Sequence, residues 1–88
     1  MHAVVTRVTI NDREAATSHL REDVVPGVSQ APGFVAGYWA RGDDGTGLAM
    51  VIFESEEAAT NMSERVPSLL TDAVTLESVE VREVVANA

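Results

Sequence analysis

The stretch GFVAGYWARGDDGTGLAMVIF, residues 33–53, decides the fold of this 88-residue chain. Two apolar runs, at about 34–41 and 48–54, flank the turn GDDGTG, whose glycines and aspartates are typical of a β-hairpin. Apolar residues stand at nearly every position of these runs rather than at every second one. Strands with this pattern are buried on both faces, so the hairpin needs two covering layers.

The residues before the hairpin predict a strand and a helix. β-branched residues are concentrated at 3–10, which favours a strand. Apolar residues then recur at helical spacing over about 12–25, and Asn11 can cap the helix that this spacing predicts. Pro26 and Gly27 are typical helix-ending residues, so the helix is expected to end there.

The residues after the hairpin predict a second helix and a last strand. Ser55 can cap this helix, and Pro67 is expected to end it near Val66. A long strand is expected at about 75–86. The order β-α-β-β-α-β, with right-handed crossovers, predicts a single α+β domain over residues 1–88. Its fold is ferredoxin-like, a four-stranded antiparallel sheet with both helices on one face.

The two faces of this sheet are expected to have different covers. Simple alternation directs one set of side chains toward the helices: Phe34, Ala36, Tyr38, Ala49, Val51 and Phe53. The other set forms a bare apolar face: Val35, Gly37, Trp39, Leu48, Met50 and Ile52. Such a face on a soluble chain marks an interface, and a second copy of the chain can cover it. We therefore expect a homodimer closed as an eight-stranded barrel, with its interface at Val35, Trp39, Leu48, Met50 and Ile52.

The amino-acid composition limits the kinds of partner that the chain is expected to bind. Fourteen acidic residues against six arginines give a formal net charge of −8, which repels nucleic-acid phosphates and anionic lipid surfaces. Neither nucleic acid nor membrane is therefore expected as a partner. The absence of cysteine excludes disulfides and thiolate metal sites, and no His, Asp and Glu grouping has metal-site spacing, so neither metal nor cofactor is expected. No signal peptide or membrane-spanning run is predicted, and a cytoplasmic location is expected.

The hairpin and the helix start after it carry a family resemblance. Pro32, Gly33 and Phe34 lead into the second strand, and the third ends in an aromatic and an acid followed by Ser-Glu-Glu-Ala at 53–58. With these motifs, and over essentially its whole length, the chain resembles the antibiotic biosynthesis monooxygenase (ABM) superfamily of dimeric α/β barrels. The motifs are structural, so the resemblance implies the fold more specifically than the activity.

The family resemblance implies two kinds of chemistry. Some members oxidise aromatic polyketides to quinones without a cofactor, and others bind and degrade haem. The haem degraders resemble one another in an Asn on the first strand, a Trp at the end of the third and an iron-ligating His on the second helix. This chain has Val5, Thr6 and Arg7 on the first strand, Phe53 at the end of the third, and Asn-Met-Ser at 61–63. The resemblance therefore does not extend to haem degradation.

Cofactor-free oxygenation needs a dry cavity and a polar group that removes or stabilises a phenol proton. The candidate catalytic residues are Tyr38, which could orient a ligand between sheet and helices, and His19, which could act as a base near neutral pH. Each also has a structural interpretation. Tyr38 could be a core aromatic whose hydroxyl reaches the surface, and His19 a solvent-facing or capping residue.

The candidate ligand-binding residues are Arg7, Phe53 and Met62. Arg7, like Arg41, could reach a ligand carboxylate or phenolate, although arginines on strands more often pair with neighbouring acids. Two functions therefore stay open. One is an ABM-like monooxygenase acting on an aromatic small molecule, with a polar-lined pocket. The other is a non-catalytic dimer, either a small-ligand-binding protein or a structural or stress-related module, with a pocket filled by apolar side chains.

Overall fold

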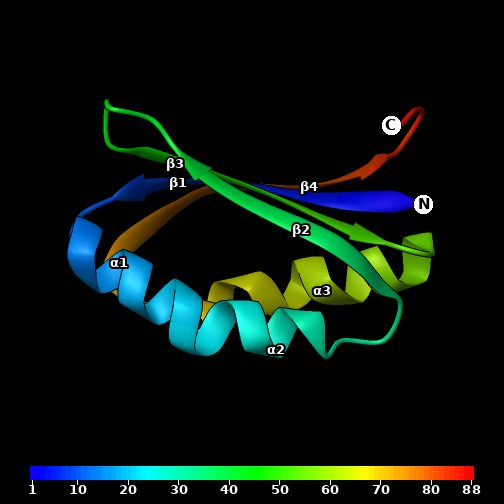
Figure 1. Cartoon of the computed structure of the whole chain (residues 1–88), viewed down its shortest axis with the longest axis horizontal. Coiled ribbons are helices and arrows are strands. Elements are labelled where there is room, and N and C mark those ends of the chain that lie inside the picture. Colours follow the sequence, from blue (N-terminus) through cyan, green and yellow to red (C-terminus); the bar gives the residue numbers. More distant parts are fainter.

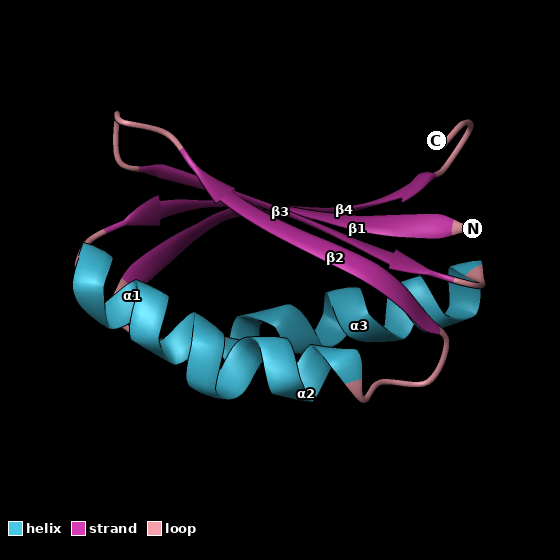
Figure 2. Ribbon diagram, in the orientation of Figure 1, coloured by secondary structure: helices cyan, strands magenta, loops and turns pink.

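The computed structural model describes residues 1–88 as one sheet covered by helices on one face. The elements in chain order are β1 (His2–Ile10), α1 (Arg13–His19), the π-helical turn η1 (Leu20–Val24), α2 (Val25–Ser29), β2 (Phe34–Arg41), β3 (Thr46–Phe53), α3 (Glu56–Leu69) and β4 (Val74–Glu83). The sheet is antiparallel in the order β2-β3-β1-β4. All helices lie below it in Figure 1, and Figure 2 shows that no helix or strand covers its upper face. The predicted ferredoxin-like βαββαβ fold is confirmed.

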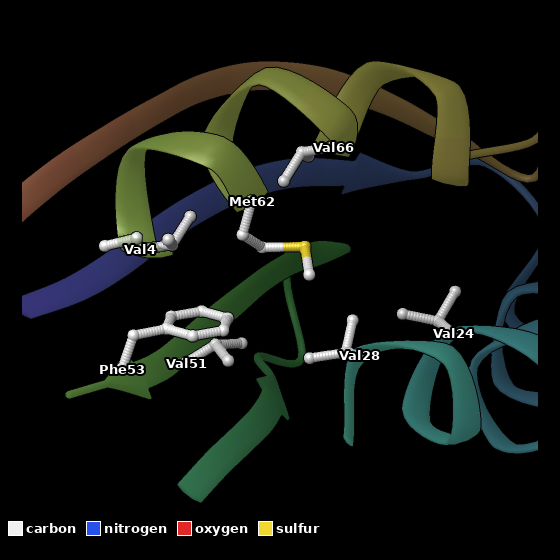
Figure 3. Close-up of a cluster of buried hydrophobic side chains, with 8 residues drawn as sticks. Val4, Val24, Val28, Val51, Phe53, Met62 and Val66 are labelled. Atoms are coloured by element: carbon white, nitrogen blue, oxygen red, sulfur yellow. The ribbon is translucent and has the colours of Figure 1, made fainter. Parts of the chain in front are cut away.

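The core lies between these two layers. Met62 and Val66 of α3 point at the sheet, where Val4 and Phe53 meet them, and Val28 approaches from α2 (Figure 3). Phe53 has no exposed surface, and the Phe34 ring stands edge-on to it at a centroid distance of 6.2 Å. Burial of these side chains is the main favourable term in the folding of so small a domain.

The first helix is longer than the sequence predicts. The predicted end at Pro26 and Gly27 is wrong, because the helix continues to Ser29. Its core-facing residues recur every four positions over 16–28, which exceeds the 3.6 residues of an α-helical turn. In η1 the N–H of Val25 donates to the carbonyl of Leu20, five residues earlier, and this wider turn keeps the stripe facing the sheet. The extra turn buries Val28, and that burial holds the helix past the proline.

The second helix also passes its proline. Ser55 caps it as predicted, by accepting from the N–H of Ala58 at 3.1 Å. The predicted end at Pro67 is wrong, since α3 continues to Leu69. The ring of His19 on α1 lies 2.7 Å from the Leu69 carbonyl oxygen through Nε2. This contact satisfies one of the free carbonyls at the end of the helix.

The cap of the first helix is displaced by one residue from the prediction. Asp12, rather than Asn11, caps α1 by accepting from the N–H of Ala15 at 3.0 Å. The Asn11 amide instead donates to Thr75 Oγ1 at 2.9 Å and to the Asp72 carbonyl. Asn11 therefore ties the end of β1 to the start of β4.

A β-bulge at Val35 interrupts the pairing of β2 with β3. Phe34 lies opposite Phe53, but Ala36 rather than Val35 lies opposite Ile52. Over this step β2 therefore contributes two residues, Val35 and Ala36, where β3 contributes only Ile52. Because side chains alternate with period two, one extra residue moves everything after it to the other face.

This reversal corrects the predicted faces of four β2 residues, since Ala36 and Tyr38 lie on the open face and Gly37 and Trp39 on the helix-covered face. Trp39 lies opposite Ala49 on the helix-covered face, and Tyr38 lies opposite Met50 on the open face. Tyr38 is 68% exposed, whereas the Trp39 ring packs against the core. The predictions that Tyr38 points between sheet and helices, and that Trp39 lies on the open face, are therefore wrong.

A second bulge, at Glu77, adjusts β4 in the same way. Arg7 lies opposite Ser78, but Val8 lies opposite Leu76. Regular alternation would place Leu76 on the opposite face from Val79 and Val81, but the bulge lets all three pack against the core. The strand also ends at Glu83 rather than near residue 86.

The open face of the sheet is apolar over β2 and β3. Val35, Leu48 and Met50 are between 40% and 46% exposed. On β4 the face becomes polar, where Arg82 donates to Glu80. In Figure 1 the β2–β3 turn and the C-terminal residues both bend away from the helices, and they leave this face open between them. No helix of the chain combines the length and the apolar character that crossing a bilayer demands.

The packing of Trp39 over Gly37 is tested by glycine substitutions. Gly37 lies under the indole of Trp39, because a Cβ built on Gly37 would be 2.7 Å from Trp39 Cη2. We expect Gly37→Ala to destabilise the fold by about 1–3 kcal/mol, a typical cost of overpacking, and to shift the emission of Trp39. Gly27→Ala is the control, since its Cβ would have no neighbour within 4 Å. We expect the control to stabilise the fold slightly. Denaturant unfolding followed by circular dichroism measures both, and equal effects would contradict the packing of the Trp39 indole over Gly37.

The turn of the hairpin is tested by pH. Asp44 Oδ1 accepts from the hydroxyl of Thr46 at 2.7 Å and from its N–H at 3.2 Å, and these bonds hold the pKa of Asp44 below its ordinary value of 3.8. A lowered pKa means that the carboxylate stabilises the folded turn above pH 3.8 and that this contribution is lost as the pH falls through the lowered value. We expect Thr46→Val to raise the pKa of Asp44 toward 3.8 in an NMR carboxyl titration. Thr60→Val, an exposed change on α3, is the control and leaves the titration of Asp44 unchanged.

Candidate functional site

A cavity of about 410 Å³ lies between the sheet and the helices. Seventeen of its 24 lining residues are hydrophobic. Val4, Val8 and Ile10 of β1 line it from the sheet, and Leu20 and Val24 of η1 line it from the helices. Its volume and its apolar lining are those of sites for small molecules.

Small residues leave this space open. Ala49 on β3 and Ala16 on α1 line the cavity where larger side chains would fill it. Gly47 lies beside Val8, whose Cγ2 would be 2.7 Å from a Cβ on the glycine. Trp39 is the aromatic residue of the lining. The bulge at Val35 therefore places the largest side chain of the chain against this cavity.

Two arginines line the cavity, one from the edge strand β2 and one from η1. Arg41, the last residue of β2, donates from Nη1 to Thr17 Oγ1 of α1 at 2.9 Å. The Thr17 hydroxyl in turn donates to the Arg13 carbonyl at 2.9 Å, so its oxygen is oriented to accept from Arg41. Arg21 follows Thr17 by four residues and also lines the cavity. Neither Arg21 nor Arg41 forms an ion pair with an acidic residue.

His19 lines the cavity, but its ring nitrogens are committed elsewhere. Nδ1 lies 3.0 Å from a carboxylate oxygen of Asp23, and Nε2 lies 2.7 Å from the Leu69 carbonyl oxygen. Both partners accept hydrogen bonds, so both nitrogens face acceptors. The ring therefore links η1 to the end of α3, and neither nitrogen is directed at a ligand in the cavity.

The other sequence-predicted residues are divided among three places. Met62 lines the cavity as expected. Phe53 lies in the closed core beside it, with no exposed surface and outside the cavity lining. Arg7 and Tyr38 are exposed residues of the sheet that do not line the cavity. The structure thus brings His19 and Met62 to one cavity and places Tyr38, Arg7 and Phe53 elsewhere.

Sequence reasoning missed Trp39, Thr17 and Arg21 as cavity residues. A signal existed for Arg21, which stands next to Leu20 in the core-facing stripe of the first helix. No local signal existed for Trp39, because its direction depends on the bulge. Nowhere does the fold gather three or more His, Asp or Glu side chains with the geometry to hold a metal ion.

Comparison with known proteins supports the fold. No family model and no curated protein sequence matches the chain. Among solved structures it is similar to the haem-degrader MhuD from Mycobacterium tuberculosis, determined with two haems bound in its active site. The TM-score is 0.57 at 18% identity, and the match covers 97% of this chain and 98% of MhuD. At this identity the likeness shows the fold.

A haem held by histidine requires a ring nitrogen that is free to bind the iron. His19 is the one histidine of the lining, and both its nitrogens are within 3.0 Å of Asp23 or Leu69 oxygens. An iron–imidazole bond would require one of these contacts to break. The residues present therefore do not fit histidine-ligated haem.

Proposed function

We propose that this chain is a binding protein for a small, largely apolar molecule, which it holds in the cavity between the sheet and the helices. The observation that carries the proposal is the cavity of about 410 Å³ with its predominantly hydrophobic lining. A cavity costs stability in proportion to its volume, because the side chains around it lose packing contacts. A ligand that fills the space restores those contacts.

The cavity favours binding over oxygenation. Cofactor-free oxygenation needs a group that takes a phenol proton beside the ligand. Both nitrogens of His19 face Asp23 and Leu69, and Tyr38 is directed away from the cavity. The remaining polar groups of the lining are hydroxyls and arginines, which bind and orient an oxygen-bearing ligand but are poor bases near neutral pH.

We also propose that a second copy of the chain covers the open face. The exposed apolar residues of β2 and β3 support this homodimer: Val35, Tyr38, Leu48 and Met50. Ile52 extends the same face along β3, and Tyr38 takes the place that the sequence assigns to Trp39. Removing each 100 Å² of apolar surface from water is favourable by about 2.5 kcal/mol, which opposes the entropy that the two copies lose on association.

The cavity is tested with N-phenyl-1-naphthylamine, a neutral apolar fluorophore whose emission rises in apolar surroundings. We expect saturable binding of one fluorophore per chain, together with quenching of Trp39, the single tryptophan. Ala49→Leu fills the cavity and should weaken binding by about tenfold or more, the effect of losing roughly 1.4 kcal/mol. Ala16→Leu fills the same space from α1, and it replaces Ala49→Leu as the test if that variant fails to fold.

The matched control is Ala15→Leu, which adds the same side chain on the exposed face of α1, outside the cavity. It should bind the fluorophore like the unaltered chain. Absence of saturable binding to the unaltered chain, or equal binding by the Ala49→Leu, Ala16→Leu and Ala15→Leu variants, would refute a ligand site in this cavity.

The dimer is tested by sedimentation at micromolar concentration. We expect a species of about twice the chain mass of 9.4 kDa. Met50→Glu places a charge in the centre of the open face and should give a folded monomer, because an unpaired charge is costly to bury. Thr60→Glu, on an exposed position of α3, should leave the dimer intact. A monomer of the unaltered chain at these concentrations would rule the proposal out.

A further inference from the structure

We infer that the ligand carries a carboxylate beside its apolar body, and that Arg41 and Arg21 bind this carboxylate at the edge of the cavity next to β2. The inference rests on the proposed ligand-binding function and adds the chemical class of the ligand. It follows from the position, the bonding and the charge surroundings of the two arginines.

Arg41 is placed by the sheet and held by α1. The bulge at Val35 sets Trp39 and Arg41 on the helix-covered face, where Arg41 lies opposite Gly47. Its guanidinium donates one hydrogen bond, to Thr17 Oγ1 at 2.9 Å. A guanidinium has five N–H donors, so four remain without an acceptor in the chain. Thr17 therefore orients Arg41 and leaves most of its hydrogen-bonding capacity for a ligand.

Arg21 brings a second positive charge to the same cavity. It lies in η1, four residues after Thr17, and lines the cavity with Arg41. No carboxylate lies within ion-pair distance of either arginine, although the chain carries 14 acidic residues and a net charge of −8. Two cations that share one cavity and have no counter-ion in the protein form a local site of positive potential.

The other four arginines of the chain do not combine a position in the cavity with the lack of an acidic partner. Arg82 pairs with Glu80 on the open face. Arg7, Arg13 and Arg65 have no acidic partner either, but they lie outside this cavity. Only Arg21 and Arg41 combine free donors with an adjoining apolar space.

The two parts of the site fit the two parts of an amphipathic acid. The hydrophobic lining takes the apolar body, and the planar guanidinium of Arg41 matches the geometry of a carboxylate, with which arginine forms paired hydrogen bonds. Arg41 is an exposed residue, so the carboxylate need not be fully removed from water. This arrangement avoids the large cost of burying a charge in the apolar interior.

The test compares 2-naphthoate with 2-naphthamide, which have the same shape and differ in charge. Each competes with N-phenyl-1-naphthylamine for the full-length protein. We expect 2-naphthoate to bind about tenfold more tightly than the amide, as charge-assisted hydrogen bonds add roughly 1.4 kcal/mol or more. Added salt should weaken the binding of the naphthoate and leave that of the amide unchanged.

Variants assign the preference to particular side chains. Arg41→Gln should lower the affinity ratio of naphthoate to naphthamide by the larger factor, toward one. Arg21→Gln should lower the ratio by a smaller factor, and Arg65→Gln, remote from the cavity, should leave it unchanged. Thr17→Val removes only the hydroxyl that orients Arg41, and it should also lower the ratio. It replaces Arg41→Gln as the test if that variant fails to fold.

The outcomes separate this inference from the proposed function. If the neutral fluorophore does not bind at all, the proposed ligand site itself fails. If it binds, but the naphthoate and the amide compete equally or the preference survives in both Arg41→Gln and Thr17→Val, the carboxylate site is wrong and the apolar cavity stands.

Discussion

The single extra residue in β2, at Val35, determines what the helix-covered side of the sheet presents to the cavity. Because alternation has period two, the bulge turns Trp39 and Arg41 toward the helices and Tyr38 toward the open face. With regular pairing, Tyr38 would face the helices and Arg41 would be separated from Thr17. The position of Trp39 in the cavity wall and the position of Arg41 beside Thr17 therefore both depend on one irregularity of pairing.

The helices adapt to the same cavity. The π-helical turn lets a four-residue repeat keep facing the sheet, and it presents Leu20, Arg21 and Val24 to the cavity within one turn. His19, at the start of this turn, bonds the end of α3 and so connects the two helices that cover the sheet. A π-helical turn is a costly irregularity that occurs often at functional sites, which agrees with its position here.

Charge and apolar surface are distributed unevenly over the molecule. The chain is strongly acidic, yet two of its six arginines line one cavity without acidic partners. Four of its six exposed large hydrophobic side chains likewise lie on β2 and β3, while the β4 side of the open face carries the Glu80–Arg82 pair. The cavity with its two arginines and the apolar open face thus both lack partners within the chain. An anionic group would complement the first, and an apolar surface would complement the second.

The sequence by itself determined the elements, their order and the ferredoxin-like sheet, because these follow from local signals. The β-branched runs, the Gly-Asp turn and the Ser55 cap each act within a few residues of their own position. The bulges at Val35 and Glu77 shift each strand against its neighbour, so pairing with that neighbour was needed to show that Trp39 faces inward. The helices pass Pro26 and Pro67 through contacts far along the chain, namely the burial of Val28 and the bond from His19 to Leu69. The cavity and its arginines were decided by the tertiary structure alone, since they form between the sheet and the helices from residues of β1, α1, η1, β2, β3 and α3, and no single segment contains that arrangement.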